Sequence, residues 1–169
     1  RLSSPEKNSL SFAIVFFSFL SCRNDEDTVQ KIDQVIHIYI DSAGQDLLNT
    51  NIKGGYTNAK MNDVYGLTDT APVNFSPKKD TDTINYIEYI ADARRIGIDS
   101  SGSSKIYESK IALSFTKNLT DSTSTTINDT MTVQYRLTPE IFQVSKIWYN
   151  SVLQFTKVAE EPNIVKIQK

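Results

Sequence analysis

Apolar and polar side chains alternate along several stretches of the chain. In residues 35–40 every second position is isoleucine, and the positions between hold Val35, His37 and Tyr39. A period of two residues is typical of a β-strand with one buried face. No window of a dozen residues keeps the 3.6-residue stripe of an amphipathic helix. The two-residue period recurs in residues 105–115, 131–137 and 152–158, and more weakly in residues 63–67, 84–90 and 94–99.

Turn-forming residues separate these stretches. Residues 41–44 and 99–102 each follow an expected strand and end in glycine, and residues 150–151 fit a tight hairpin between two apolar runs. Residues 68–83 and 117–129 have no period, so we expect a long loop and an exposed crossover there. Together these patterns predict an all-β fold, an antiparallel immunoglobulin-like β-sandwich of about seven or eight strands.

The most apolar stretch, residues 10–20, ends just before the only cysteine, Cys22. It is shorter than the roughly 20 residues that span a bilayer as a helix, but it matches the apolar core of a secretory signal. Arg1 and Lys7 supply the positive flank of such a signal, and Ser21 supplies the small residue before its cleavage point. Because the chain opens with arginine, we also expect a few residues to precede it.

The segment Phe19-Leu20-Ser21-Cys22 resembles the lipobox of a bacterial lipoprotein signal. The resemblance implies that Cys22 is acylated and that the lipid bilayer is a partner of the chain. Two or more acyl chains give stable anchoring, since each buried CH₂ contributes about 0.8 kcal/mol. The alternative is a buried structural cysteine. We therefore expect a signal peptide in residues 1–21, an acylated and flexible acidic tether in residues 22–31, and one β-sandwich domain in residues 32–169.

An acidic stretch follows the cysteine directly. It resembles the export signal of Bacteroidota lipoproteins, which directs them to the outer membrane, and it consists of Asn24, Asp25, Glu26 and Asp27. This implies a lipid-anchored protein of the bacterial outer membrane, on its periplasmic side or at the cell surface. A plain solvated linker explains the same residues, and a calcium site would need a glycine-containing loop that this stretch lacks.

Three segments of the body also resemble uncharacterised Bacteroidota lipoproteins. These segments are residues 40–48, 53–56 and 146–150, the last containing Trp148, Tyr149 and Asn150. The first corresponds to a strand and its turn, and the last to a terminal hairpin. The resemblance implies a fold and a location, and it carries no activity.

Charge and composition exclude several classes of function. The 169 residues include 18 basic and 20 acidic side chains, a net charge of -2, so no polybasic surface is available for nucleic acid. With one cysteine and one histidine, the chain has no disulfide framework and no zinc cluster. We expect no cofactor and no metal.

No catalytic residues are indicated. His37 has no nucleophile or orienting partner at a recognisable spacing, and no G-x-S-x-G elbow is present. Asp41 and Asp46 offer too few oxygens for calcium, and a hairpin turn explains them equally well. The pairs Asp80/Asp82 and Asp92/Asp99 are no more specific, although two carboxylates for glycoside hydrolysis depend on spatial separation alone.

Two softer signals remain. Trp148 and Tyr149 fit a platform on which a ligand stacks, whereas the alternative is that Trp148 packs in the core. Ser122 and Thr130 lie in D-[S/T]-x triplets that resemble the acceptor of O-glycosylation in Bacteroidota. We expect a non-enzymatic lipoprotein domain that binds an envelope protein or a glycan, or that supports the envelope. A glycan-active hydrolase or a carbohydrate-binding surface protein is the alternative.

Overall fold

The computed structural model describes residues 29–169, of which Lys31–Lys169 form one compact unit. The predicted signal peptide, Cys22 and the four residues of the acidic export signal lie outside the described residues, and the predictions made for them stay predictions. Between residues 29 and 169, no helix is long and apolar enough to cross a membrane.

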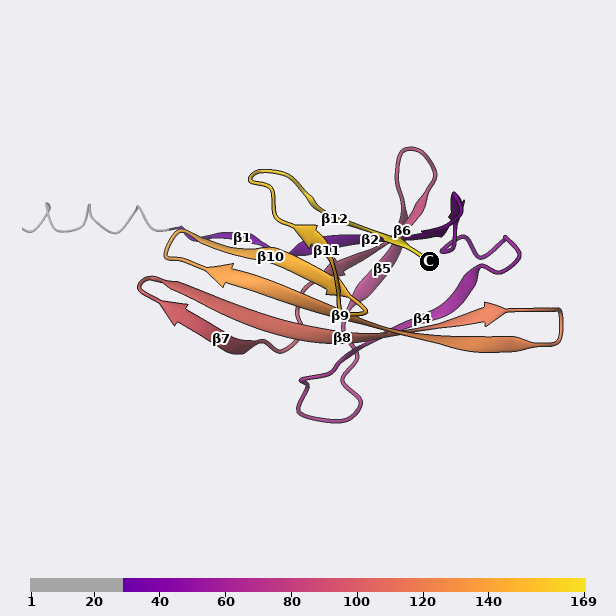
Figure 1. Cartoon of the computed structure of the whole chain (residues 1–169), viewed down its shortest axis with the longest axis horizontal. Helices are drawn as coiled ribbons and strands as arrows, with labels where there is room; N and C mark the ends of the chain where they lie inside the picture. The colour runs from indigo at the N-terminus through magenta and orange to yellow at the C-terminus, as the bar shows by residue number, and fades with distance from the viewer. Residues whose placement is uncertain (1–28) are drawn as a thin grey trace, which may run out of the picture. The chain divides into compact units, whose positions relative to one another are not determined.

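The described chain is all-β, which confirms the predicted class (Figure 1). It forms twelve strands instead of the seven or eight expected, because several short strands carry no legible period. The strands are β1 (Lys31–Asp33), β2 (Val35–Ser42), β3 (Gln45–Asp46), β4 (Tyr56–Asp63), β5 (Phe75–Lys79), β6 (Asn85–Ile90), β7 (Ile96–Ser101), β8 (Ser104–Asn118), β9 (Ser124–Leu137), β10 (Ile141–Tyr149), β11 (Val152–Thr156) and β12 (Asn163–Gln168).

The strands build two sheets. The seven-stranded sheet has the order β1-β10-β9-β8-β4, with β11 paired to β10 and β7 paired to β8. The five-stranded sheet has the order β12-β2-β6-β5, with β3 paired to β2. Pairs β1–β10 and β12–β2 are parallel, so the expectation of a purely antiparallel fold is wrong. Gln34 separates β1, in the seven-stranded sheet, from β2, in the five-stranded sheet, and each of these two strands has one parallel neighbour.

Both sheets contribute to one hydrophobic core. The alternation predicted for β2, β8 and β9 is confirmed, since one side-chain row of each strand is buried. Burying each large apolar side chain contributes about 1.5–3 kcal/mol. The fully buried side chains include Ile36, Ile38, Ile40, Tyr89, Ile111, Leu113, Phe115, Met131, Val133, Tyr135, Val144 and Ile147.

The hairpin turns lie where the sequence predicts them. Ala43 and Gly44 turn β2 into β3, and Asn150 and Ser151 turn β10 into β11, all with positive φ. Two consecutive residues of positive φ are typical of a tight turn that matches the twist of its strands. Gly102, also at positive φ, lies in the turn between β7 and β8.

Three expectations about irregular or strand segments are wrong. Residues 117–129 do not form a crossover: β8 runs to Asn118 and β9 begins at Ser124, because threonine-rich sequence suits strands as well as loops. The expected loop of residues 68–83 contains the edge strand β5. The expected strand of residues 63–67 is a turn instead, since the Asp63 carboxylate accepts the N–H of Tyr65 at 3.0 Å and ends β4.

Candidate functional site

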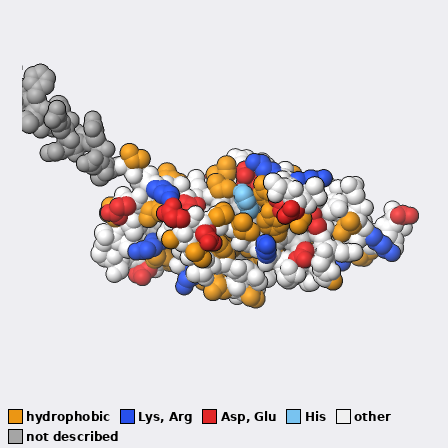
Figure 2. All heavy atoms as spheres, turned by 90° about the horizontal axis from the view of Figure 1, so that it is seen from above, with side chains coloured by type: hydrophobic (Ala, Val, Ile, Leu, Met, Phe, Trp, Pro, Cys, Tyr) orange, Lys and Arg blue, Asp and Glu red, His pale blue; other side chains and the backbone are white. Residues whose placement is uncertain are grey.

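The central strands of the two sheets differ in what they show to solvent, although Ile98, Val152 and Leu153 are exposed on edge strands of the seven-stranded sheet. On the seven-stranded sheet, the outward positions of β8 and β9 are mainly polar: Glu108, Lys110, Ser114, Thr116, Thr130, Thr132, Gln134 and Arg136. The five-stranded sheet instead carries aliphatic and aromatic side chains outward. Among them, Val35 is 39% exposed, Ile90 is 49% exposed and Ile164 is 37% exposed. Figure 2 shows the single histidine within this apolar surface.

Sheet register brings the outward residues of four strands together. His37 lies opposite Glu88 on β6 and beside Ile164 on β12, and Tyr39 lies beside Lys166. The same β6 row continues to Tyr86, whose neighbour on β5 is Lys78. We call this surface the outer face of the five-stranded sheet; it consists of Val35, His37, Tyr39, Lys78, Tyr86, Glu88, Ile90, Ile164 and Lys166.

Three aromatic rings form the centre of this face. The ring centroids of Tyr39 and Tyr86 are 5.2 Å apart with an interplanar angle of 25°, and those of His37 and Tyr86 are 4.6 Å apart. Such pairs stabilise by about 0.5–1.5 kcal/mol beyond the area they bury. The rings therefore support one another as a half-buried strip whose remaining surface meets solvent.

Charged groups border the aromatic strip on one side. Glu88 accepts a hydrogen bond from the Lys78 ammonium at 2.8 Å, and its other oxygen lies 3.4 Å from Nε2 of His37. The hydrogen bond from Lys78 lowers the pKa of Glu88 and raises the pKa of Lys78. Glu88 is therefore a carboxylate at neutral pH, held in place by two strands.

A hollow of about 520 Å³ lies at the other end of the strip. Tyr39 forms part of its wall, and its hydroxyl donates to Asp80 at 3.1 Å. Burial and this hydrogen bond raise the pKa of Tyr39 to about 12. Asp80 also accepts the N–H groups of Asp82 and Ile84, at 2.9 Å and 3.0 Å, which closes the β5–β6 turn. The hydrogen bond to Asp80 and the stacking on Tyr86 thereby fix the orientation of the Tyr39 ring.

Two of the four aspartates that line this hollow, Asp46 and Asp80, hold the fold together; Asp41 and Asp82 are the others. Asp46 accepts the N–H and the side-chain amide of Asn85, at 2.9 Å and 2.7 Å, and also the N–H of Leu48. Asp80 accepts the hydrogen bonds described above, so both carboxylates are engaged within the fold. Within residues 29–169, no three His, Cys, Asp or Glu side chains form a group that could hold a metal ion. The site offers aromatic stacking and hydrogen bonding.

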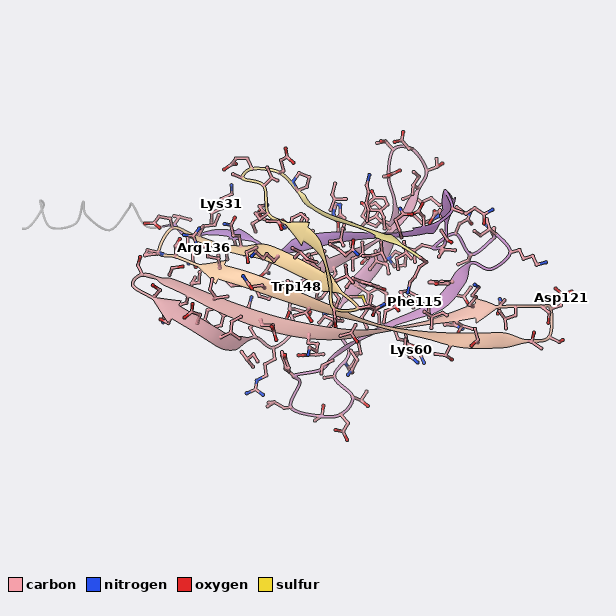
Figure 3. All side chains as sticks on the ribbon, viewed as in Figure 1. Lys31, Lys60, Phe115, Asp121, Arg136 and Trp148 are labelled. Atoms are coloured by element: carbon pink, nitrogen blue, oxygen red, sulfur yellow. The ribbon has the colours of Figure 1, made fainter. Side chains whose placement is uncertain are left out.

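Trp148 and Tyr149, the residues of the expected platform, lie on opposite sides of β10. Tyr149 is buried, whereas Trp148 is half-buried beside Thr132 of β9 and Leu153 of β11 (Figure 3). The two side chains therefore do not form one stacking surface. Trp148 is directed away from the core row that holds Ile147 and Tyr149, so it is not a core residue.

Tyr149 instead belongs to a buried polar cluster with Asp129. Its hydroxyl donates to Asp129 at 2.6 Å, and Asn150 and Lys169 donate to the same carboxylate, at 3.0 Å and at 2.7–2.8 Å. Burial acts to raise the pKa of Asp129, but these hydrogen bonds hold it below its usual value. Burial and the bond to Asp129 raise the pKa of Tyr149. The cluster joins β9, β10 and the segment after β12.

The remaining candidate residues lie apart from one another. Ser122 is exposed in the β8–β9 turn, where Figure 3 labels its neighbour Asp121, and Thr130 is exposed on β9. Their glycosylation stays a prediction. Asp41 and Asp46 are cross-strand partners in the β2–β3 hairpin, the arrangement that a plain turn predicts.

No protein-family model, curated protein or solved structure matches this chain. The resemblance to Bacteroidota lipoproteins therefore stays a prediction, and the site is interpreted from its own geometry. Its main residues, Tyr39 and Tyr86, are not among the site residues that the sequence predicts. One sequence signal could have indicated this site. The outward positions of β2 hold Val35, His37 and Tyr39, whereas a strand whose outer side faces only water carries polar residues there.

Proposed function

We propose that residues 32–169 are a non-enzymatic binding module that contacts its partner through the outer face of the five-stranded sheet. The observation that supports this is a contrast between the central strands of the two sheets. Strands β8 and β9 carry mainly polar side chains outward, whereas the five-stranded sheet exposes Val35, Ile90 and Ile164 around an aromatic strip. Exposed apolar surface of this kind marks interaction sites in folded proteins.

The location is part of the same proposal. The lipobox-like segment before Cys22 supports anchoring by acyl chains, and residues 24–27 support export to a bacterial outer membrane. In this arrangement the tether holds the module at the membrane while the face meets an envelope protein or a glycan. An immunoglobulin-like description of the body is supported by its two sheets and by the change of sheet between β1 and β2.

Site-specific photocrosslinking in intact source cells tests the binding face. We would place p-benzoylphenylalanine at Tyr86, and in a matched control at Thr132, which points outward from the seven-stranded sheet. A defined adduct from position 86 and none from position 132 is expected. Equal adducts from both positions, or none from position 86, would contradict the proposal.

The same adduct separates the two partner classes. A discrete band that also contains peptides of a second protein indicates a protein, and a ladder that glycosidase collapses indicates a glycan. The stacked pair Tyr39 and Tyr86 beside a polar hollow is the observation that keeps the glycan as a second candidate, because sugar rings stack on aromatic faces while their hydroxyls take hydrogen bonds.

Lipid attachment has its own test. Cells labelled with radioactive palmitate should incorporate label into the wild-type chain, and the Cys22→Ser variant should lose both the label and its sedimentation with membranes. Label that persists in the variant, or a wild-type chain without label, would refute the anchor and leave the proposed face untouched.

A further inference from the structure

Strand β12 forms one edge of the five-stranded sheet. Its six residues pair with β2 in parallel and in continuous register, from Asn163 beside Ile36 to Gln168 beside Asp41. No described strand is hydrogen-bonded to its other side, although β11 of the other sheet lies close to it. Asn163, Val165 and Ile167 are buried in the core, so the strand is held firmly in place.

The backbone direction along β12 follows from one hydrogen bond. The N–H of Lys169 donates to the carbonyl of Asp41 at 2.8 Å, so residue 169 directs its backbone groups toward β2. In a β-strand the N–H and C=O of one residue point to the same side, and successive residues alternate. The backbone groups of Ile164, Lys166 and Gln168 therefore point to the open edge.

Other sheet edges carry features that prevent strand addition. Strand β5 has Pro77 in its centre and ends in Lys78 and Lys79, and both proline and lysine block pairing at an edge. The edge of β4 is covered by residues 71–73, since Val73 donates its N–H to the carbonyl of Met61 at 3.1 Å.

The short and irregular strands are protected in other ways. The pairing of β7 with β8 shifts register between Gly97 and Asp99, and that of the five-residue β11 with β10 shifts between Ile147 and Trp148. Strands β1 and β3 have three and two residues. By contrast, β12 has no proline, no glycine and no break of register, and Lys166 is its one charged residue. It is an edge left ready for pairing.

We propose that an extended segment of a partner polypeptide adds to β12 as a further strand of the five-stranded sheet. A row of outward N–H and C=O groups is matched by the same row on another backbone, so the occupant is a polypeptide. The inference rests on the proposed function, because the side chains of Ile164 and Lys166 belong to the outer face of the five-stranded sheet. A strand added beside β12 extends that face, and its alternate side chains lie next to Ile164.

The probe is a phage-displayed library of random twelve-residue peptides, selected on the full chain. Enriched peptides are then measured against two variants, Lys166→Pro and Lys166→Ala. Both variants lack the lysine side chain, and Lys166→Pro alone lacks the outward N–H, so their difference isolates the backbone. The bonds to β2 use residues 165 and 167 and are kept in both variants.

We expect Lys166→Pro to bind enriched peptides about tenfold or more weakly than Lys166→Ala, since the peptide carbonyl placed opposite residue 166 has no N–H donor in the proline variant. Equal binding by the two variants, or a selection without enrichment, overturns the inference. Far-UV circular dichroism checks that each variant is folded. Should Lys166→Pro fail to fold, Gln168→Pro near the end of β12 removes another outward N–H and is compared with Gln168→Ala.

Hydrogen exchange supplies an independent readout on the unmodified chain. The amides of Ile164, Lys166 and Gln168 should exchange quickly in the free protein and slowly with an enriched peptide bound. Exchange that the peptide leaves unchanged overturns the inference.

Crosslinking distinguishes a failure of this inference from a failure of the proposed function. The crosslinker is placed at position 86, or at the control position 132, in cells that carry each β12 variant. If Lys166→Pro and Lys166→Ala give equal amounts of a specific adduct from position 86, the proposed binding face stands and strand addition is overturned. The absence of any specific adduct from position 86 in the wild-type background removes the proposed face itself.

Discussion

Replacing Asp129 with asparagine tests the buried polar cluster that joins β9, β10 and the segment after β12. Asp129 is 5% exposed and accepts hydrogen bonds from Tyr149, Asn150 and Lys169. Asparagine has the same shape, but it has no charge and turns an N–H₂ group toward these donors.

The expected loss follows from the environment of each partner. Hydrogen bonds to a charged group contribute about 1.5–3 kcal/mol, and breaking a buried ion pair costs about 3–5 kcal/mol. The Lys169 side chain is 24% exposed, so its ammonium regains part of its hydration when the carboxylate is removed. We therefore expect Asp129→Asn to lower the free energy of unfolding by about 3 kcal/mol at pH 7.

The loss should depend on pH with a definite sign. The pKa of Asp129 lies below its usual value in the folded chain, so its contribution to stability is present above the unfolded pKa of about 4 and is lost as pH falls through the folded pKa. The difference between wild type and Asp129→Asn should therefore shrink as the pH is lowered below about 4.

Urea denaturation followed by the fluorescence of Trp148, the only tryptophan, measures both effects. The variant Lys169→Met and the double variant complete a cycle, in which we expect a coupling energy of at least about 1 kcal/mol. A loss below about 0.5 kcal/mol for Asp129→Asn at pH 7, or a loss that does not change with pH, would refute the reasoning.

Three further predictions concern the turns, the aromatic strip and the core. Ser151 has φ 68°, so Ser151→Gly should raise the free energy of unfolding by about 0.5–1 kcal/mol in thermal denaturation, and a decrease would contradict the turn geometry. Asp80→Asn should lower the pKa of Tyr39 from about 12, yet keep it above 10 because the burial of the side chain remains. NMR of ¹³C-labelled tyrosine follows the titration, and an unchanged pKa would argue against the hydrogen bond to Asp80. Phe115→Ala, at a site 1% exposed, should cost about 3–5 kcal/mol in urea denaturation, while Thr116→Ala on the opposite side should cost less than about 0.5 kcal/mol. Similar costs for the two variants would mean that Phe115 is not a core residue.

The predictability of each strand depends on how one-sided its burial is. Strands β2, β8 and β9 bury one row of side chains and expose the other, so their sequences show the two-residue period plainly. Strand β11 was expected from its apolar residues, yet Val152 and Leu153 are 57% and 49% exposed. Strand β4 was missed because its outward positions include Asn58, which has φ 52° at a break in the register with β8.

The candidate site was harder to predict than the strands. Tyr39 and Tyr86 become neighbours only through the antiparallel pairing of β2 with β6, which sets His37 opposite Glu88. Trp148 and Tyr149 show the converse: adjacent residues of one strand point to opposite faces, so neighbours in sequence are separated by the sheet.

Local chemistry was enough to determine the all-β class, the tight turns and the inward rows of the long strands, because each depends on residues a few positions apart. Only the tertiary structure decided which strand lies beside which, and so which outward rows join into one face and which edge stays open. The reason is that strand pairing depends on how apolar rows from separate parts of the chain pack over one core. This packing brings together side chains that are far apart in the sequence, so their separation in the sequence does not predict their distance in space.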